Sequence, residues 1–221
     1  MKTPLLLSMF LLSAIGLQAQ TFNECAAEFR SKWQKIQLDA VTQKRNDKKV
    51  DSLFRTLESA FESCIIGNEL PQFNLTTLSG NLVTNESLSG KVVYLNIWTI
   101  HCGACWQEIP VLNKLDTVYN GNEDFVFISL LLDKEQELSE FLEGHKKRIG
   151  ALTNRNIEID FDLIANEAPF GNKDLSKILP FPTHLFIDKQ GKISKKLTGS
   201  FFDSQKQETY LRTAIDELLA K

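Results

Sequence analysis

The sequence offers few side chains that could hold a metal ion. Only 4 cysteines and 3 histidines occur among its 221 residues. Cys25 and Cys64 lie far apart and well before the other two cysteines, and the histidines form no H-x-x-x-H pair. Because a structural zinc site needs four clustered ligands, this scarcity argues against zinc. We expect neither a metal ion nor a cofactor.

Long runs of charge of one sign are also absent. The net charge is −3, and the 25 basic and 28 acidic residues are mixed along the chain. No basic stripe of the kind that binds nucleic acid is present, and neither is an acidic tail. We therefore expect no nucleic-acid partner.

No apolar run in the chain reaches the ~20 residues that cross a membrane comfortably. The run over residues 4–17 follows a single lysine and leads to Leu17-Gln18-Ala19, which has the form of a small-residue cleavage site. This arrangement is typical of a signal peptide, and an uncleaved anchor is the alternative that its length disfavours. We predict cleavage near Ala19 and export to the periplasm, an oxidising compartment where disulfides persist.

The stretch that carries chemistry is a pair of cysteines in C-x-x-C spacing, Cys102 and Cys105. The apolar residues 92–98 before it predict a buried strand, and apolar residues after it recur at helical spacing. The pair therefore lies where a strand ends and a helix begins. Unpaired N–H groups and the positive end of the helix dipole stabilise a thiolate in the first turn. We expect Cys102 to be the nucleophile and Cys105 to resolve the mixed disulfide.

Two helices precede this unit in the sequence. Residues 21–24 have the form of a capping box, and apolar residues at helical spacing follow it and recur after the polar stretch 43–49. The helices should form an antiparallel hairpin that brings Cys25 and Cys64 together at its open end. We predict a structural disulfide between them, which contributes ~4 kcal/mol in the chain-entropy model. A second redox pair is the weaker alternative, because no activating group neighbours either cysteine.

The remainder of the chain alternates between strand and helix patterns. The expected elements are short strands around a turn at 79–81, a buried strand over 125–132, a half-exposed strand over 157–163, a short helix within 171–179, a hairpin of strands over 183–197 and a final helix over 204–219. The strand, helix and strand between 91 and 132 should form a right-handed βαβ unit. We therefore divide the chain into a signal peptide (1–19), a helical hairpin (20–66) and an α/β domain (67–221).

Several stretches of the α/β domain together resemble the TlpA/ResA-like branch of the thioredoxin superfamily, within the AhpC/TSA–redoxin clan. They are Gly67 with Pro71-Gln72-Phe73, residues 90–98, the two cysteines with Glu108 and Pro110, and Pro182-Thr183 followed by 185–188. The resemblance implies a thioredoxin-like α/β fold, with a central mixed sheet flanked by helices and the helical hairpin as an N-terminal extension. It also implies a cis peptide bond at Phe181-Pro182, next to the cysteines.

The same resemblance implies roles for other side chains. Glu108 matches an acidic residue near the inner cysteine, about one helical turn past Cys105. Burial there would raise its pKa and let it relay a proton; a surface glutamate is the alternative. The implied substrate-binding residues are Trp98, His101, Phe181 and Pro182.

The motif departs from the family pattern in two places. His101 stands where family members usually carry an aromatic residue, commonly tryptophan, and Gly103-Ala104 lacks the proline that is frequent between the cysteines. A protonated His101 would favour the Cys102 thiolate, and an exposed, untuned histidine is the alternative. These departures leave the redox assignment in place and the reduction potential open.

The leading interpretation is an exported thiol–disulfide oxidoreductase of the protein-disulfide reductase type. The resemblance implies protein disulfide substrates, a membrane thiol–disulfide electron donor, and a role in cytochrome maturation or cell redox homeostasis. A peroxiredoxin-like peroxidase is disfavoured, because the residues before Cys102 lack the proline of the Pro-x-x-x-Thr/Ser-x-x-Cys pattern. The third interpretation is a non-catalytic binding module with a permanent Cys102–Cys105 bridge, which the position of the pair at a helix end disfavours.

Overall fold

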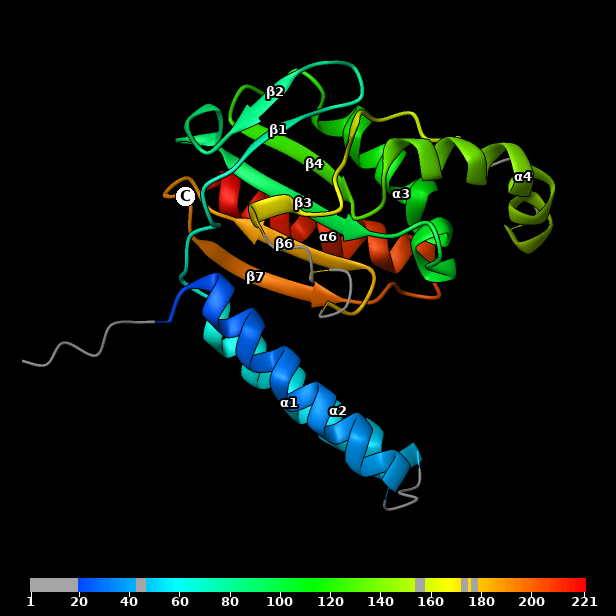
Figure 1. Ribbon diagram of the computed structural model, residues 1–221. Helices are drawn as coiled ribbons and strands as arrows, with labels where there is room; N and C mark the ends of the chain where they lie inside the picture. Colours follow the sequence, from blue (N-terminus) through cyan, green and yellow to red (C-terminus); the bar gives the residue numbers. More distant parts are fainter. Residues whose placement is uncertain (1–19, 43–46, 154–157, 172–174, 176–178) are drawn as a thin grey trace, which may run out of the picture.

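The computed structural model describes residues 20–42, 47–153, 158–171, 175 and 179–221 (Figure 1). The segment predicted as a signal peptide lies outside these residues, as does most of the short helix expected within 171–179. Within the described part of the chain, no helix is both long enough and apolar enough to span a membrane.

A five-stranded mixed sheet forms the centre of the molecule, in the order β5-β4-β3-β6-β7 (Figure 1). β3 (Val92–Trp98) lies in its middle, parallel to β4 (Phe125–Leu131) and antiparallel to β6 (Thr183–Ile187). β5 (Leu163–Ala165) and β7 (Ile193–Thr198) form the edges. Every residue of β3 is buried, because other elements cover both faces of the sheet. The predicted central mixed sheet is confirmed.

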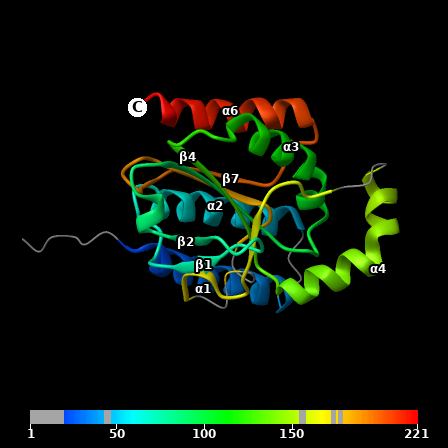
Figure 2. The ribbon, with the colours of Figure 1, turned by 90° about the horizontal axis from the view of Figure 1, so that it is seen from above.

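Helices pack on both faces of this sheet. α3 (Gly103–Tyr119) and α6 (Ser204–Leu219) share one hydrophobic cluster with one face. The hairpin of α1 (Phe22–Thr42) and α2 (Asp47–Ile65) shares a second cluster with the opposite face. Figure 2 shows the sheet between these two layers, with α4 (Glu135–Thr153) extending outward at one end.

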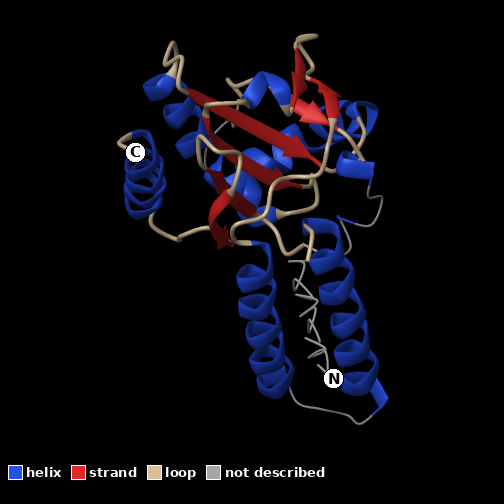
Figure 3. Cartoon of the chain, turned by 90° about the vertical axis from the view of Figure 1, so that its left-hand side faces the viewer, coloured by secondary structure: helices blue, strands red, loops and turns tan. Residues whose placement is uncertain are grey.

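The α1–α2 hairpin projects from the body of the molecule as two adjacent antiparallel helices (Figure 3). Its first turn carries the predicted capping box, in which the Thr21 backbone N–H donates to Glu24 Oε2 at 2.7 Å and the Glu24 N–H faces Thr21 Oγ1 at 3.4 Å. At the open end a disulfide joins Cys25 and Cys64, with their Cα atoms 5.9 Å apart. This is the pairing that the hairpin geometry predicts.

The base of the hairpin is fixed to the sheet by a buried ion pair. Lys196 of β7 places Nζ 2.9 Å from a Glu58 carboxylate oxygen on α2, and its side chain is 2% exposed. The same ammonium group lies 5.8 Å from the centroid of the Phe61 ring. Around this pair, phenylalanines of the hairpin join the cluster that covers the sheet: Phe22, Phe29 and Phe61.

The half-exposed strand expected over 157–163 is wrong for residues 158–162, and residue 157 lies outside the described residues. The strand in this region is β5, which begins only at Leu163. Asn113 of α3 explains the difference, because its side chain accepts a hydrogen bond from the Asp160 N–H at 3.1 Å and donates to the Glu158 carbonyl at 2.8 Å. The backbone of this alternating segment is therefore bonded to a side chain of α3, and not to a neighbouring strand.

Two short strands and two 3-10 turns are the remaining named elements of the described residues. β1 (Asn74–Thr76) and β2 (Leu82–Thr84) pair as a separate antiparallel sheet around the predicted turn. A 3-10 turn, η1 (Glu86–Leu88), leads into β3, and another, η2 (Pro169–Gly171), follows β5.

Candidate active site

The two cysteines of the motif lie beyond the carboxyl end of β3. Cys102 is the N-cap residue of α3, with φ −93° and ψ 102°, and its sulfur accepts a hydrogen bond from the Cys105 backbone N–H at 3.1 Å. The connecting loop is held by Asp133, whose carboxylate accepts from the Ile100 N–H at 2.9 Å. The extended backbone of an N-cap residue thus ends the strand and starts the helix at the first cysteine.

The two sulfurs form a disulfide and differ in their surroundings. Cys102 is partly exposed, whereas Cys105 is 1% exposed. After reduction, the Cys105 N–H and the helix dipole would both stabilise a thiolate on Cys102. The arrangement therefore suits attack by Cys102 on a partner and attack by Cys105 on the resulting mixed disulfide.

The Phe181-Pro182 segment lies at the same end of the sheet. The peptide bond between these residues is cis, as the resemblance implies. β6 begins at the next residue, Thr183, which pairs with Ile97 near the end of β3. The Pro182 carbonyl accepts from the Gly199 N–H at 2.8 Å, which fixes the segment against the end of β7.

The prediction that Trp98 belongs to an exposed substrate-binding surface is wrong. Its side chain is 2% exposed, packs edge-on against Trp106 and donates from Nε1 to Ser129 Oγ at 2.9 Å. The cause is its position on the central strand, on the face that α3 covers. His101 is exposed, Phe181 is half-buried and Pro182 is buried, so His101 and Phe181 are the members of the predicted set that a partner could reach.

Glu108 lies inside the protein, one helical turn past Cys105. It is 1% exposed, and its two carboxylate oxygens accept from Asn96 Nδ2 at 2.9 Å and from Gln207 Nε2 at 2.7 Å. Burial raises the pKa of Glu108 to about 8, and the hydrogen bonds from Gln207 and Asn96 oppose this rise. A carboxyl group with such a pKa can both accept and release a proton near neutral pH.

His184 and Tyr94 extend this polar cluster. Tyr94 lies within the family-like stretch 90–98, whereas His184 belongs to none of the quoted stretches. His184 of β6 is fully buried and lies between Glu108 and Tyr94 of β3, whose hydroxyl is 2.8 Å from Nδ1. Burial lowers the pKa of His184 to about 4. Asn96 and His184 each interrupt an apolar strand sequence, which is the signal that could have identified them.

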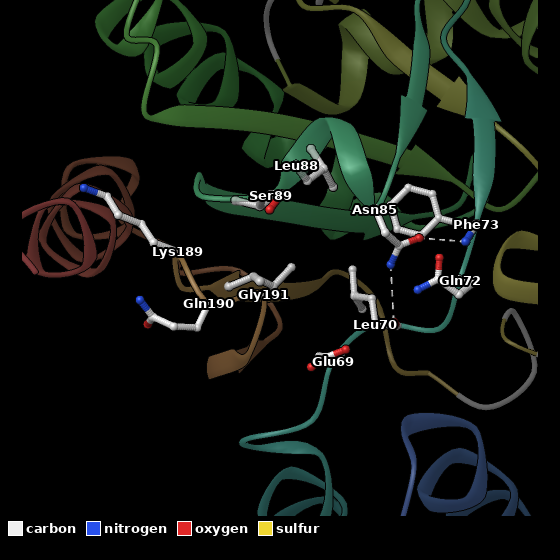
Figure 4. Close-up of a pocket in the computed structure, with 12 residues that line it drawn as sticks. Glu69, Leu70, Gln72, Phe73, Asn85, Leu88, Ser89, Lys189, Gln190 and Gly191 are labelled. Carbon is white, nitrogen blue, oxygen red and sulfur yellow. Dashed lines mark hydrogen bonds between the residues drawn. The ribbon is translucent and has the colours of Figure 1, made fainter.

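A separate pocket lies at the opposite end of the sheet (Figure 4). It is lined by the start of β3, the end of β6 and the segment after the hairpin, and Asn85 spans one side by accepting from the Phe73 N–H at 2.8 Å. Because β3 runs away from this pocket toward the cysteines, the pocket does not belong to the candidate active site.

Comparison with protein-family models matches residues 65–211 to the Redoxin family. The match begins at the last residue of α2, so the α1–α2 hairpin lies almost entirely outside it. Among curated proteins, the chain is 28% identical over 163 residues to the thiol-disulfide oxidoreductase ResA of Bacillus cereus (strain ATCC 10987 / NRS 248). That alignment covers 73% of this chain and 85% of the relative. The ResA protein of another Bacillus cereus strain is 30% identical over 140 residues, 62% of this chain and 72% of the relative.

Two solved structures share the fold at similar identity. One, from Chlorobium tepidum, is provisionally assigned as a thiol:disulfide interchange protein DsbE; it is 26% identical, with a TM-score of 0.52 over 70% of this chain and 97% of that chain. The other, from Bacteroides thetaiotaomicron, is provisionally assigned as a protein disulfide isomerase; it is 27% identical, with a TM-score of 0.52 over 71% of this chain and 91% of that chain.

Proposed function

The chain belongs to the Redoxin family and is a thiol–disulfide oxidoreductase of its TlpA/ResA-like branch, and from this premise we propose that it is an exported reductase of protein disulfides. The observation that carries the proposal is the asymmetry of the cysteine pair. Cys102 is partly exposed at a helix N-terminus, and Cys105 is buried behind it.

In the proposed reaction the reduced enzyme donates two electrons. The Cys102 thiolate attacks one sulfur of a substrate disulfide, which breaks that bond and releases the other sulfur as a thiol after it takes up a proton. Cys105 then transfers its proton to the Glu108 carboxylate and attacks Cys102 Sγ. The Cys102–Cys105 disulfide forms, and the second substrate thiol leaves with a proton.

The partner surface in this proposal is small. We assign it to His101, which precedes Cys102 and is exposed, and to the half-buried Phe181 of the cis Phe181-Pro182 segment at the same end of the sheet. A polypeptide carrying a disulfide would lie across these residues. Protein disulfides fit the proposal because the reactive sulfur lies at the surface rather than at the end of a deep cavity.

Export and re-reduction complete the proposed function. The sequence pattern of residues 1–19 supports a signal peptide that precedes the hairpin (20–66) and the thioredoxin-like domain (67–221). An exported reductase needs a donor that returns two electrons to Cys102–Cys105 after each turnover. We therefore propose a membrane thiol–disulfide protein as this donor.

The reduction potential of the Cys102–Cys105 pair tests the direction of the reaction. We expect a value near or below the ~−270 mV of thioredoxin, measured by equilibration of the mature protein with glutathione or dithiothreitol buffers. A value toward ~−120 mV would instead identify an oxidant that makes disulfides. A pair that dithiothreitol cannot cycle would support a permanent bridge.

Single cysteine variants test the order of attack. Cys105→Ser should accumulate a mixed disulfide between Cys102 and a substrate such as insulin, whereas Cys102→Ser should form none. Mass spectrometry under non-reducing conditions detects the adduct. The reverse pattern would contradict the assigned roles, and consumption of hydrogen peroxide by the native protein would favour a peroxidase.

A further inference from the structure

Nitrogen atoms surround the Glu108 carboxyl group on three sides. Asn96 on β3 and Gln207 on α6 donate to its oxygens, and His184 Nε2 on β6 lies 3.4 Å from Oε2. All four side chains are at most 1% exposed. Three donors around one acid form an environment that suits the ionised carboxylate, in opposition to the effect of burial.

The hydrogen on the His184 ring can be placed from its neighbours. Nδ1 faces the Tyr94 hydroxyl at 2.8 Å and Asn96 Nδ2 at 3.4 Å. Because an amide nitrogen can only donate, Nδ1 is the acceptor. The ring is neutral near pH 7, since burial lowers the pKa of His184 to about 4. The single ring hydrogen therefore lies on Nε2, on the side of Glu108.

Among the described residues, Nε2 of His184 has no partner that meets hydrogen-bond geometry, although it is fully buried; the Gly199 backbone is the other acceptor near the ring. A buried N–H without a partner is costly, and a small movement of either side chain would close the 3.4 Å separation from Glu108 Oε2. The hydrogen bond formed by that movement is stronger when Glu108 is ionised than when it is protonated, because hydrogen bonds to charged groups are the stronger kind.

We propose that His184 is a positioning residue for Glu108: its Nε2–H turns to the carboxylate and stabilises the ionised form that takes the proton of Cys105. The inference rests on the proposed function of Glu108 in disulfide exchange. It predicts that loss of the Nε2–H leaves Glu108 protonated to higher pH, which slows the attack of Cys105 near neutrality.

Tyr94 and Lys196 are the other ionisable groups that act on this pair. Burial and the Glu108 charge raise the pKa of Tyr94 well above its ordinary value, so its hydroxyl keeps its hydrogen. The Gly199 backbone favours a protonated His184 and the Lys196 charge disfavours it, and Lys196 is itself paired with Glu58. The amides of Asn96 and Gln207 carry no charge. In the oxidised protein the two cysteines of α3 are disulfide-bonded, so the carboxyl signal of Glu108 can be followed alone.

Carboxyl ¹³C NMR of the oxidised protein measures the pKa of Glu108 directly. We expect His184→Phe, which keeps a ring but lacks the Nε2–H, to raise this pKa by about one unit. His184→Gln places an amide nitrogen near the Nε2 position and should restore most of the wild-type value. Tyr119→Phe, which removes a hydroxyl bonded to Asp216 near the end of α3, is a matched control and should leave Glu108 unchanged.

An unchanged Glu108 pKa in folded His184→Phe would overturn the proposal. If that variant does not fold, His184→Leu replaces it, because leucine is smaller than phenylalanine and also lacks the Nε2–H. The Glu108 pKa should rise in this variant as in His184→Phe. The absence of any rise in folded His184→Leu would then overturn the proposal equally.

This titration does not depend on the proposed function, because the oxidised protein performs no exchange during the measurement. In the exchange assay, the pH midpoint of Cys105 attack should rise by the same amount in His184→Phe. That rise should vanish when Glu108→Gln is also present. A coupled titration in a protein that exchanges no disulfides would contradict the proposed function and leave the His184–Glu108 coupling in place.

Discussion

Glu108 has a raised pKa only while the protein is folded, because an unfolded chain returns the carboxyl group to about 4.3. The folded value is about 8, so the folded state binds more protons than the unfolded state between these values. Stability is therefore highest below the unfolded pKa and falls as pH rises through the folded one. We expect Glu108→Gln to remove this fall. Urea unfolding of the oxidised proteins at pH 5 and pH 8 measures it.

The expected outcome is a difference between wild type and Glu108→Gln that grows by at least ~2 kcal/mol from pH 5 to pH 8, in favour of the variant. His184 contributes the opposite slope, because its lowered pKa makes stability rise with pH toward 6.5. Because His184 lies 3.4 Å from Glu108, its contribution does not cancel between the two proteins. Further measurements at pH 7 and pH 8 lie above the range in which His184 contributes, and they isolate the Glu108 part of the slope. Equal pH slopes for the two proteins would contradict the raised pKa.

The positions of the two cysteines and Glu108 could be predicted from local spacing, because all three lie along one helical stretch, about one turn apart. The partners of Glu108 could not be predicted in the same way. Asn96 is 12 residues away in the sequence and Gln207 is 99 away. Their meeting depends on the order of strands in the sheet and on the packing of α6 over it. The prediction for Trp98 was wrong for a related reason. Its burial depends on α3, which covers the face of the sheet on which Trp98 lies.

The attachment of α2 to β7 can be tested through its buried ion pair. Glu58→Ala leaves the Lys196 ammonium without its partner in a site where the lysine side chain is 2% exposed. Removal of one member of a buried pair costs ~3 kcal/mol, and partial exposure of Glu58 moves the expected loss toward ~2 kcal/mol. Replacing both members, with Glu58→Leu and Lys196→Met, should recover part of the loss. Chemical unfolding of each variant measures it.

A matched control exists on the surface. Lys192 and Glu69 form an ion pair at 2.8 Å with side chains that are 44% and 61% exposed. Glu69→Ala should change the free energy of unfolding by at most ~0.5 kcal/mol. If Glu58→Ala costs no more than this control, the buried pair does not hold the hairpin to the sheet.

Elements with a clear period could be predicted with close boundaries. β3, the β6–β7 hairpin and α6 follow from apolar runs, a turn sequence and a helical stripe. The start of β5 could not be predicted in this way. Asn113 bonds to the backbone of the preceding residues, and the strand begins only at Leu163. The alternating pattern was real, but a side chain 45 residues earlier in the sequence determines its backbone pairing.

The hairpin shares one hydrophobic cluster with the sheet, although the sequence pattern divides the chain between them. Phe22, Phe29 and Phe61 pack in the same cluster as Leu95 and Leu185 of the sheet. A cluster shared in this way makes the two parts unfold together. The sequence could indicate two amphipathic helices, but it could not indicate the sheet face that they cover.

The Cys25–Cys64 disulfide should therefore stabilise the whole molecule rather than the hairpin alone. It closes a loop with a sequence separation of 39, and its removal in a Cys25→Ser, Cys64→Ser variant should cost ~4 kcal/mol in the chain-entropy model. Because the hairpin shares the core of the sheet, circular dichroism and tryptophan fluorescence should report one coincident transition at a lower urea concentration. The Cys102–Cys105 pair remains intact in this variant, so its reduction potential is the control and should not move. Two separate transitions, with the sheet unfolding as in wild type, would show that the hairpin is an independent appendage and that the shared cluster contributes little to the stability of the sheet.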